Sequence, residues 1–431
     1  MVPAIAVFAS IVAIFSLLVA GRRLRFTPAQ AARLFWAVCA LAFAVGMICQ
    51  PKEVFDGATM GLKAWWNIVF PSLLPFFIAS ELLMSFGLVN FIGALTEPLM
   101  RPLFNVPGCG SFVLCVGYTS GYPIGAMVTA RLRSEKQLTR IEAERLMSFT
   151  NNSSPLFMFV AVSVGMFGRP ELGIIIAGSH YLANLTLGLV LRFYGMNDRE
   201  ALPLRGDPHE NILARAYREL VSAWRKETRP MGKIIGDAVR NATGSLLAIG
   251  GFIILFAVII KLITKAGFIS YMARFMGLIL NPLGFSSEIM PALASGFFEM
   301  TIGSKMAAES SASLMQQLVA VEIILAWSGL SVHAQVAGMI SETDIRMLPF
   351  ICSRIIHAAL AVFYTIFIFG PAMPLTSGFI IPVAAAMGKM HETPGLLTGL
   401  KFSAIQFGSM LSLLLAISLI YCAVRKLRAD S

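Results

Sequence analysis

The chain has few charged residues. Of its 431 residues, 13% are Asp, Glu, Lys or Arg and 57% are apolar, whereas about a quarter of an ordinary soluble domain is charged. A soluble fold cannot bury so much apolar surface, so a soluble enzyme is excluded. Several apolar runs approach the roughly 18 to 20 residues that span about 30 Å of hydrocarbon. The composition therefore predicts an integral membrane protein.

Motifs of common catalytic and cofactor sites are also missing. The sequence contains no metal-ligand spacing, phosphate loop or dinucleotide fingerprint, so we expect neither a metal nor a cofactor. Its six cysteines include no C-x-x-C pair and lie mostly in apolar segments, which predicts reduced core residues. The net charge of +11 is explained by Lys and Arg in the cytoplasmic loops of a membrane protein, so we expect no nucleic-acid partner.

The apolar runs predict an all-α polytopic membrane protein with about eight transmembrane helices. Arg22, Arg23 and Arg25 directly follow the first run, which places the N-terminus outside and argues against a cleaved signal peptide. The basic residues after the last run place the C-terminus in the cytoplasm. The predicted spans cover residues 2–20, 34–49, 65–86, 172–193, 243–264, 313–340, 347–369 and 402–424.

Four stretches differ from ordinary spans. Residues 87–107 are amphipathic and predict an interfacial helix, whereas residues 108–134 are apolar but interrupted by glycines and predict a re-entrant hairpin. A helix over 139–166 is broken by the run Asn151-Asn152-Ser153-Ser154-Pro155. The polar section 195–233 predicts a cytoplasmic loop with a surface helix from about His209 to Glu227.

An internal repeat relates the two halves of the chain. Residues 86–92 match residues 266–272 at an offset of 180, and the break near residue 152 lies opposite a break at 327–331. Three spans separate the starts of the two units, so the second unit is inverted relative to the first. Inverted repeats with discontinuous helices are typical of secondary carriers, whose binding site lies near the bilayer midplane.

The repeat also predicts the organisation of the chain. We expect an N-terminal transmembrane pair, a first repeat, a cytoplasmic loop, a second inverted repeat, and a C-terminal loop with a last helix. Within the last part, residues 371–399 fit either an outer loop or a partial membrane insertion. The five parts cover residues 1–60, 61–194, 195–233, 234–370 and 371–431.

Polar residues at the hairpins and breaks are the candidate binding residues. A turn with Ser120 as N-cap would direct backbone N–H groups at an anion, although its glycines also fit a packing turn. Buried polar groups cost roughly 2–7 kcal/mol unless they are satisfied; the alternative to binding is that the side chains repair the break themselves. The candidates are Ser120, Gly121, Tyr122, Asn151, Asn152, Ser153, Glu299, Thr301, Ser304, Ser328, Ser331, His333 and Gln335.

Alternatives stay open for two pairs of residues. Glu299 and Lys305 are rare charges in an apolar hairpin, which face either a cavity or each other, so a structural pair is an alternative to binding. Ser331 and His333 place a hydroxyl near an imidazole, but sequence spacing alone does not create a catalytic geometry. We expect a carrier and not an enzyme.

Three motifs resemble a known family. They are Ser120 to Ala126 (SGYPIGA), Thr150 to Phe157 (TNNSSPLF) and Ala326 to Gln335 (AWSGLSVHAQ), and the last is the most specific. On these motifs, and over about residues 60–370, the sequence resembles the sporulation integral membrane protein family called YlbJ or SpoVV. That family is itself similar to the concentrative nucleoside transporters and their gate domains.

The resemblance implies a transporter that moves dipicolinic acid, an aromatic dicarboxylate, from the mother cell across the outer forespore membrane during sporulation. It also implies an elevator movement and a homotrimer. The second hairpin and break show no clear match to the nucleoside and sodium residues of the nucleoside carriers, so coupling to sodium or to protons stays open. The alternative functions are a nucleoside or other metabolite importer and a non-transporting scaffold for spore envelope assembly.

Overall fold

The computed structural model describes residues 27–155, 157–196, 212–369 and 408–420 except 410 and 419, and the described elements are all helical. Within these residues, four helical segments are long and apolar enough to cross a membrane, and up to six are if each of two bent pairs counts as one span. The predicted span 2–20, most of the span 402–424 and the ambiguous stretch 371–399 lie outside the described residues. The all-α polytopic class is confirmed, while the number of eight spans stays a prediction.

The predicted internal helices are present. The run 34–49 lies in α2 (Pro28–Cys49), and the loop 195–233 contains the expected surface helix as α10 (Ile212–Lys226). The other spans correspond to α9 (Leu172–Leu191), α11 (Met231–Lys265), the pair α15 (Leu314–Trp327) and α16 (Gly329–Ile340), and α17 (Met347–Phe369).

The span predicted at 65–86 begins earlier. The segments α3 (Pro51–Ala64), η1 (Trp65–Val69, π-helical) and α4 (Phe70–Ser85) follow one another without a gap, so the helix covers residues 51–85. It is as long as α11, which has 35 residues and lies at the same offset of 180. Charged residues in α3 hide this extension from a hydropathy search. The predicted boundary between residues 60 and 61 therefore falls inside α3.

Close packing joins these two long helices. An added Cβ on Gly61 would stand 2.9 Å from Ile254 Cα, and one on Gly57 would stand 3.1 Å from Val258 Cα. Two small residues four apart let backbones approach closely in a membrane, where packing replaces the hydrophobic effect as the force between helices. Trp65 adds a hydrogen bond from its Nε1 to Leu246 O over 2.9 Å.

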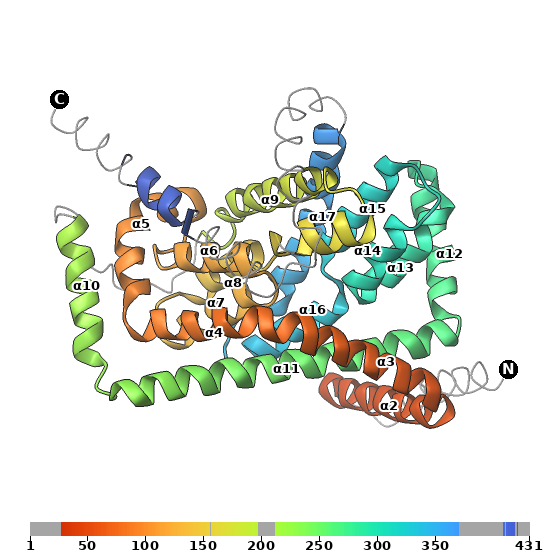
Figure 1. The fold of residues 1–431 in the computed structure, drawn as a ribbon, viewed down its shortest axis with the longest axis horizontal. Helices are drawn as coiled ribbons and strands as arrows, with labels where there is room; N and C mark the ends of the chain where they lie inside the picture. Colours follow the sequence, from red (N-terminus) through yellow and green to blue (C-terminus); the bar gives the residue numbers. More distant parts are fainter. Residues whose placement is uncertain are drawn as a thin grey trace.

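The interfacial helices support the inverted arrangement. α5 (Leu88–Phe104) and α12 (Phe268–Leu280) each start after a left-handed glycine, Gly87 with a φ of 71° and Gly267 with a φ of 79°. α5 is part of a helix pair bent by 82°. Figure 1 shows α5, with α10 beside it, at one end of α11 and α12 at the other end. Equivalent helices at opposite ends are expected when one repeat is turned over relative to the other.

Each repeat contains a helical hairpin and a broken helix, and their insertion in the membrane as re-entrant hairpins stays a prediction. The first hairpin consists of α6 (Gly110–Ser120) and α7 (Ile124–Ser134), and its broken helix of α8 (Arg140–Thr150) and the π-helical η2 (Phe157–Met166). The second hairpin consists of α13 (Met290–Phe298) and α14 (Met300–Ala308), which follow the short 3-10 turns η3 (Asn281–Leu283) and η4 (Ser287–Ile289). Its broken helix is the pair α15 and α16.

The broken helices cross between two hydrophobic cores. The first core surrounds the first hairpin, with Phe112 and Leu146, but also contains Val332 and Val336 of α16. The second core surrounds the second hairpin and α15, but also contains Met158 of η2. The far half of each broken helix therefore packs in the core of the other repeat. This exchange places both breaks at the junction of the two cores.

Candidate functional site

Each hairpin tip packs against the break of its own repeat. An added Cβ on Gly121 (φ 82°) would stand 2.7 Å from Ser154 N in the first break. An added Cβ on Gly329 (φ 74°), in the second break, would stand 2.9 Å from Phe298 O at the tip of the second hairpin. Both positions require glycine, because the backbone is left-handed and no room is left for a side chain. The two repeats thus form equivalent contacts.

The first hairpin turn differs from the predicted one. Ser120 is the last residue of α6 and not an N-cap, because Gly121 continues the chain in a left-handed conformation and Pro123 takes the N-cap position of α7. The Tyr122 hydroxyl at this turn donates a hydrogen bond to Leu325 O in the last turn of α15, over 2.8 Å. The turn therefore connects the two repeats.

Arg354 of α17 lies at the first break. Its side chain is fully buried; Nη1 donates to Asn151 O over 2.9 Å and Nη2 donates to Ser148 O. Both carbonyls belong to the C-terminal end of α8, where the helix dipole favours a cation. No carboxylate of the described residues forms an ion pair with Arg354, and its Nε has no hydrogen-bond partner among them. Within the described part of the chain, the guanidinium is thus a buried cation with no carboxylate at ion-pair distance.

Side chains of α9 satisfy further carbonyls of this break. Asn184 Nδ2 donates to Phe149 O over 2.6 Å, and the Tyr181 hydroxyl lies 3.1 Å from Ser153 O. The alternative interpretation was that the polar side chains of the break satisfy its freed backbone groups themselves. Arg354, Asn184 and Tyr181 bind these carbonyls instead. Neighbouring helices hold these carbonyls, while of the break's own side chains Ser154 accepts from Phe157 N over 3.2 Å.

Several polar side-chain atoms at the breaks have no hydrogen-bond partner among the described residues. A buried polar atom that makes no hydrogen bond costs about 1–3 kcal/mol, and several occur here within the part of the chain that the structure describes. Both amide atoms of Asn151 and Asn152 are among them, as is the hydroxyl of Ser153. The others around the hairpins and breaks belong to Tyr118, Ser120, Asn184, Ser304 and His333.

Aromatic rings connect the second break with Arg354. Ser328 (φ 69°) and the following glycine are both left-handed, which ends α15. The Trp327 ring lies 4.3 Å from the His333 ring, which lies 5.3 Å from the ring of Phe350. The guanidinium carbon of Arg354 lies 5.1 Å from that same Phe350 ring. The two breaks therefore lie on either side of one aromatic cluster.

Three more ionisable side chains lie fully buried in the spans beside the breaks. His180 of α9 has its Nδ1 3.4 Å from the Oε2 of Glu322 of α15. His357 of α17 has its Nε2 3.1 Å from His180 O, and the two imidazole rings lie 4.6 Å apart. This group links α9, α15 and α17.

The structure distributes the predicted site residues unevenly. Thr301 is exposed, and Glu299 is half-buried and caps its own helix by accepting from Ile302 N over 2.8 Å. Lys305 lies 3.8 Å from Glu309, so the alternative pair of Glu299 with Lys305 is wrong. The predicted residues that are buried at the tips and breaks are Ser120, Gly121, Asn151, Asn152, Ser153, Ser304, Ser328, Ser331, His333 and Gln335, and Tyr122 is half-buried.

Arg354, His180 and His357 were not among the predicted site residues. A usable signal existed, because ionisable residues in apolar spans are rare and usually functional. Arg354 and His357 are three residues apart, which puts both on one face of a helix. Only the fold, however, brings that face to the first break.

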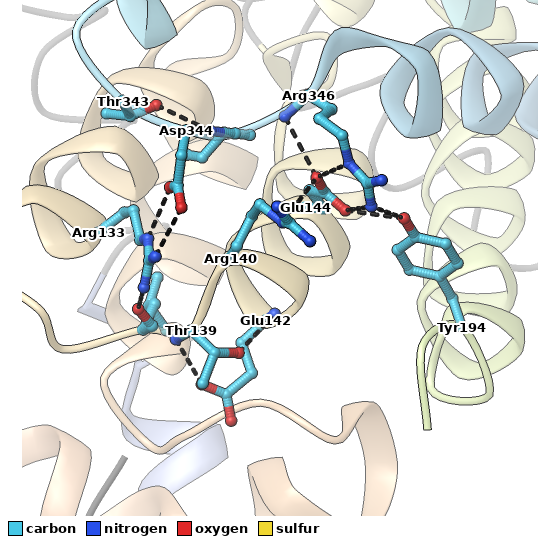
Figure 2. A network of polar contacts seen from close by, with 11 residues as sticks. Arg133, Thr139, Arg140, Glu142, Glu144, Tyr194, Thr343, Asp344 and Arg346 are labelled. Atoms are coloured by element: carbon cyan, nitrogen blue, oxygen red, sulfur yellow. Dashed lines mark hydrogen bonds and ion pairs between the residues drawn. The ribbon is translucent and has the colours of Figure 1, made fainter. Parts of the chain in front are cut away.

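A second polar network joins the repeats at one end of the broken helices (Figure 2). The buried Glu144 of α8 accepts from Arg346 Nε over 2.7 Å and from the Tyr194 hydroxyl over 2.7 Å. Arg133 of α7 donates from Nε and Nη2 to Asp344, over 2.8 and 2.7 Å. Asp344 and Arg346 lie between α16 and α17, whereas the other three belong to the first repeat. The network lies where the predicted cytoplasmic loop begins.

Comparisons with known proteins agree with the repeat. The Gate family, described as nucleoside recognition, matches residues 67–170 and 246–346, once in each repeat. A segment of 157 residues is 31% identical to an uncharacterised protein of Alkalihalophilus pseudofirmus, covering 33% of this chain and 34% of that protein. No solved structure matches the chain.

The similarity to a sporulation protein is broader. Over 325 residues the chain is 46% identical to the sporulation integral membrane protein YlbJ of Bacillus subtilis, and the match covers 75% of this chain and 80% of that protein. The apolar helices and the paired Gate matches are consistent with this similarity. The chain therefore belongs to the YlbJ family of sporulation integral membrane proteins.

Proposed function

We propose that this protein is a secondary carrier, and not an enzyme, that moves a small aromatic anion by alternating access. One observation carries the proposal. The break in the first repeat is held by Arg354, Asn184 and Tyr181, while the amides of Asn151 and Asn152 have no partner in the described part of the chain. A scaffold would gain no stability from such groups, whereas a carrier needs them for its substrate.

The charge of the site favours an anion. Within the described residues Arg354 donates to two backbone carbonyls and forms no ion pair with a carboxylate, and a buried cation is best stabilised by a carboxylate. The amides of Asn151 and Asn152 and the hydroxyl of Ser120 can donate further hydrogen bonds to such a group. A small ligand with one or two carboxylates would satisfy most of these groups at once.

Flat rings beside the break favour an aromatic ligand. The rings of Tyr118 and Tyr181 stack with their centroids 5.0 Å apart, and Asn152 and Asn184 are close to the Tyr118 hydroxyl. A planar pyridine ring would fit against such faces while its carboxylates meet the donors. We therefore propose dipicolinic acid as the substrate, carried from the mother cell across the outer forespore membrane during sporulation.

The arrangement of the repeats supports alternating access. Each broken helix joins the two cores, so a shift of the hairpins and breaks against the frame of α3, α4 and α11 would reorganise both sides together. Inverted repeats supply two conformations of similar free energy by exchanging their packing arrangements. The network around Glu144 and Arg346 would close the predicted cytoplasmic side, in an elevator-like movement.

A nucleoside is the second candidate substrate. The description of the Gate family as nucleoside recognition favours it, and the half-buried carboxylate of Glu299 could accept hydrogen bonds from ribose hydroxyls. The two substrates differ in charge, so the buried Arg354 favours the anion.

Counterflow in proteoliposomes tests the proposal. We expect vesicles that contain the purified protein and unlabelled dipicolinate to take up labelled dipicolinate, and labelled uridine not to enter. Arg354→Gln should weaken dipicolinate binding about 30-fold or more, which corresponds to about 2 kcal/mol for an unpaired buried charge. Arg354→Lys keeps the charge and should bind more tightly than Arg354→Gln.

Arg274→Gln is the matched control, because this arginine is exposed on α12, far from either break along the chain. It should transport as the unchanged protein does. Uptake of uridine without dipicolinate would favour the nucleoside carrier, and exchange of neither compound would support a scaffold.

A further inference from the structure

The contact between His180 and Glu322 joins the two repeats through ionisable groups. His180 belongs to the first repeat and Glu322 to the second, and both side chains are fully buried. The 3.4 Å between Nδ1 and Oε2 is an ion-pair distance, but the two atoms are not aligned as a hydrogen bond, and neither oxygen of Glu322 has another partner in the described residues. Either group can therefore bind a proton on the side that faces the other without breaking an existing hydrogen bond.

The other nitrogen of His180 reaches the first break. Ser153 N donates a hydrogen bond to Nε2 over 3.3 Å. An imidazole nitrogen accepts only through its lone pair, so the ring in this state is neutral and carries its proton on Nδ1, facing Glu322. The same ring therefore contacts the backbone of the break on one side and the carboxyl group of the second repeat on the other.

The surrounding titratable groups leave this pair as the one suited to take up a proton. His357 faces His180 from α17, Arg354 lies on the same helix, and Tyr122 of the first hairpin lies close enough to Arg354 and Glu322 to feel both charges. Tyr181 lies beside His180, with ring centroids 6.0 Å apart. Arginine stays charged and tyrosine stays neutral near pH 7, which leaves the imidazoles of His180 and His357 and the carboxyl group of Glu322. Of the two imidazoles, His180 lies at ion-pair distance from that carboxyl group.

We propose that His180 and Glu322 form a proton-binding site that couples one proton to each anion carried. This inference rests on the transport function proposed above. An unprotonated pair has a charge of −1, which disfavours an anion beside it. When the pair binds one proton its charge becomes zero, so this repulsion is removed and one carboxylate of the substrate can balance the positive charge of Arg354. Proton and anion therefore favour each other's binding, and the coupling is reciprocal.

The hydrogen bond from Ser153 connects this charge change to the break. With the added proton on the imidazole, Nε2 becomes a donor and can no longer accept from Ser153 N, so this contact between the break and α9 is lost while the hydrogen bonds from Asn184 and Tyr181 remain. On the opposite side of the membrane the proton leaves the pair, the lone pair of Nε2 returns, and the anion is released. One proton and one anion thus cross together, with no other reactant.

Two glutamate variants separate coupling from transport. In proteoliposomes, wild type should accumulate labelled dipicolinate when a pH gradient is imposed, and a pH dye should report proton movement with it. Glu322→Gln should keep counterflow exchange at equal pH but lose gradient-driven accumulation and proton movement at least about tenfold. Glu309→Gln is the control, because Glu309 is an exposed carboxylate whose side chain is 60% accessible, and it should behave as wild type.

The outcomes distinguish the two proposals. If wild type fails to exchange dipicolinate, the proposed function is wrong; if it exchanges dipicolinate but moves no protons, only the coupling is wrong. Accumulation by Glu322→Gln equal to that of wild type would also overturn the coupling.

Infrared difference spectra between about pH 5 and 8, recorded without substrate, test the site independently of transport. Wild type should show titration of the pair that is missing in Glu322→Gln and altered in His180→Gln, and identical spectra would refute the site.

Discussion

The Tyr122 hydroxyl donates to the carbonyl oxygen of Leu325 over 2.8 Å, and this bond ties the tip of the first hairpin to the end of α15 in the other repeat. Leu325 O lies in the last turn before the second break, where helix carbonyls lose their usual partners. The bond therefore satisfies a freed backbone group and fixes the distance between the hairpin and the second break.

Tyr122→Phe should weaken this connection. The change keeps the ring but leaves Leu325 O without this donor, which costs about 1–3 kcal/mol for a buried acceptor. We expect a lower apparent melting temperature in detergent and slower counterflow. Tyr217→Phe is the control, since Tyr217 on α10 is 63% exposed; equal melting temperatures for the two variants would contradict the proposed role of the bond.

Gly125→Ala should prevent the first hairpin from packing against the break in its own repeat. An added Cβ would stand 2.6 Å from Thr150 O and 2.9 Å from Asn151 N, both backbone atoms that cannot move independently of the break. We expect poor folding or a displaced hairpin, with a loss of dipicolinate exchange. Gly251→Ala in α11 has nothing within 4 Å of the added Cβ and should be neutral or stabilising by up to about 1 kcal/mol. Comparison of yield, monodispersity and exchange checks both.

Asp344, in the polar network of Figure 2, should make the stability of the protein depend on pH. Hydrogen bonds from Arg133, together with its positive charge, hold the pKa of Asp344 below the ordinary aspartate value. A lowered carboxyl pKa stabilises the folded protein above about pH 4, and this contribution is lost as the pH falls through the lowered value. Unfolding of wild type and Asp344→Asn should differ most near neutral pH and converge in acid. A difference that does not change with pH would contradict the ion pair.

The inverted topology predicts opposite labelling of two loops. A cysteine introduced at residue 207, which lies outside the described residues, should react only with reagents on the cytoplasmic side. One introduced at Arg169, in the loop between η2 and α9, should react only from the outside. Reaction at residue 207 from the outside would overturn the orientation and, with it, the relation between the repeats.

The sequence determined the local structure of the repeats because those features depend on nearby residues. Gly87 and Gly267 have equivalent left-handed conformations, as expected for glycines at an offset of 180 that start equivalent helices. The run Asn151 to Pro155 interrupts its helix, because proline removes a backbone donor and short polar side chains compete for backbone hydrogen bonds. The capping of α7 was missed, since the choice between Ser120 and Pro123 depends on how the turn packs against Ser154.

Only the tertiary structure decided which groups meet at the breaks. Arg354 lies more than 200 residues from Asn151 in the sequence, and His180 and Glu322 belong to different repeats. Such contacts arise because each broken helix packs half of its length in the other repeat's core, and periodicity along one helix says nothing about which distant helix faces it. The sequence alone therefore predicted two breaks in an inverted carrier fold, whereas the packing of α9, α15 and α17 determined the buried charges around them.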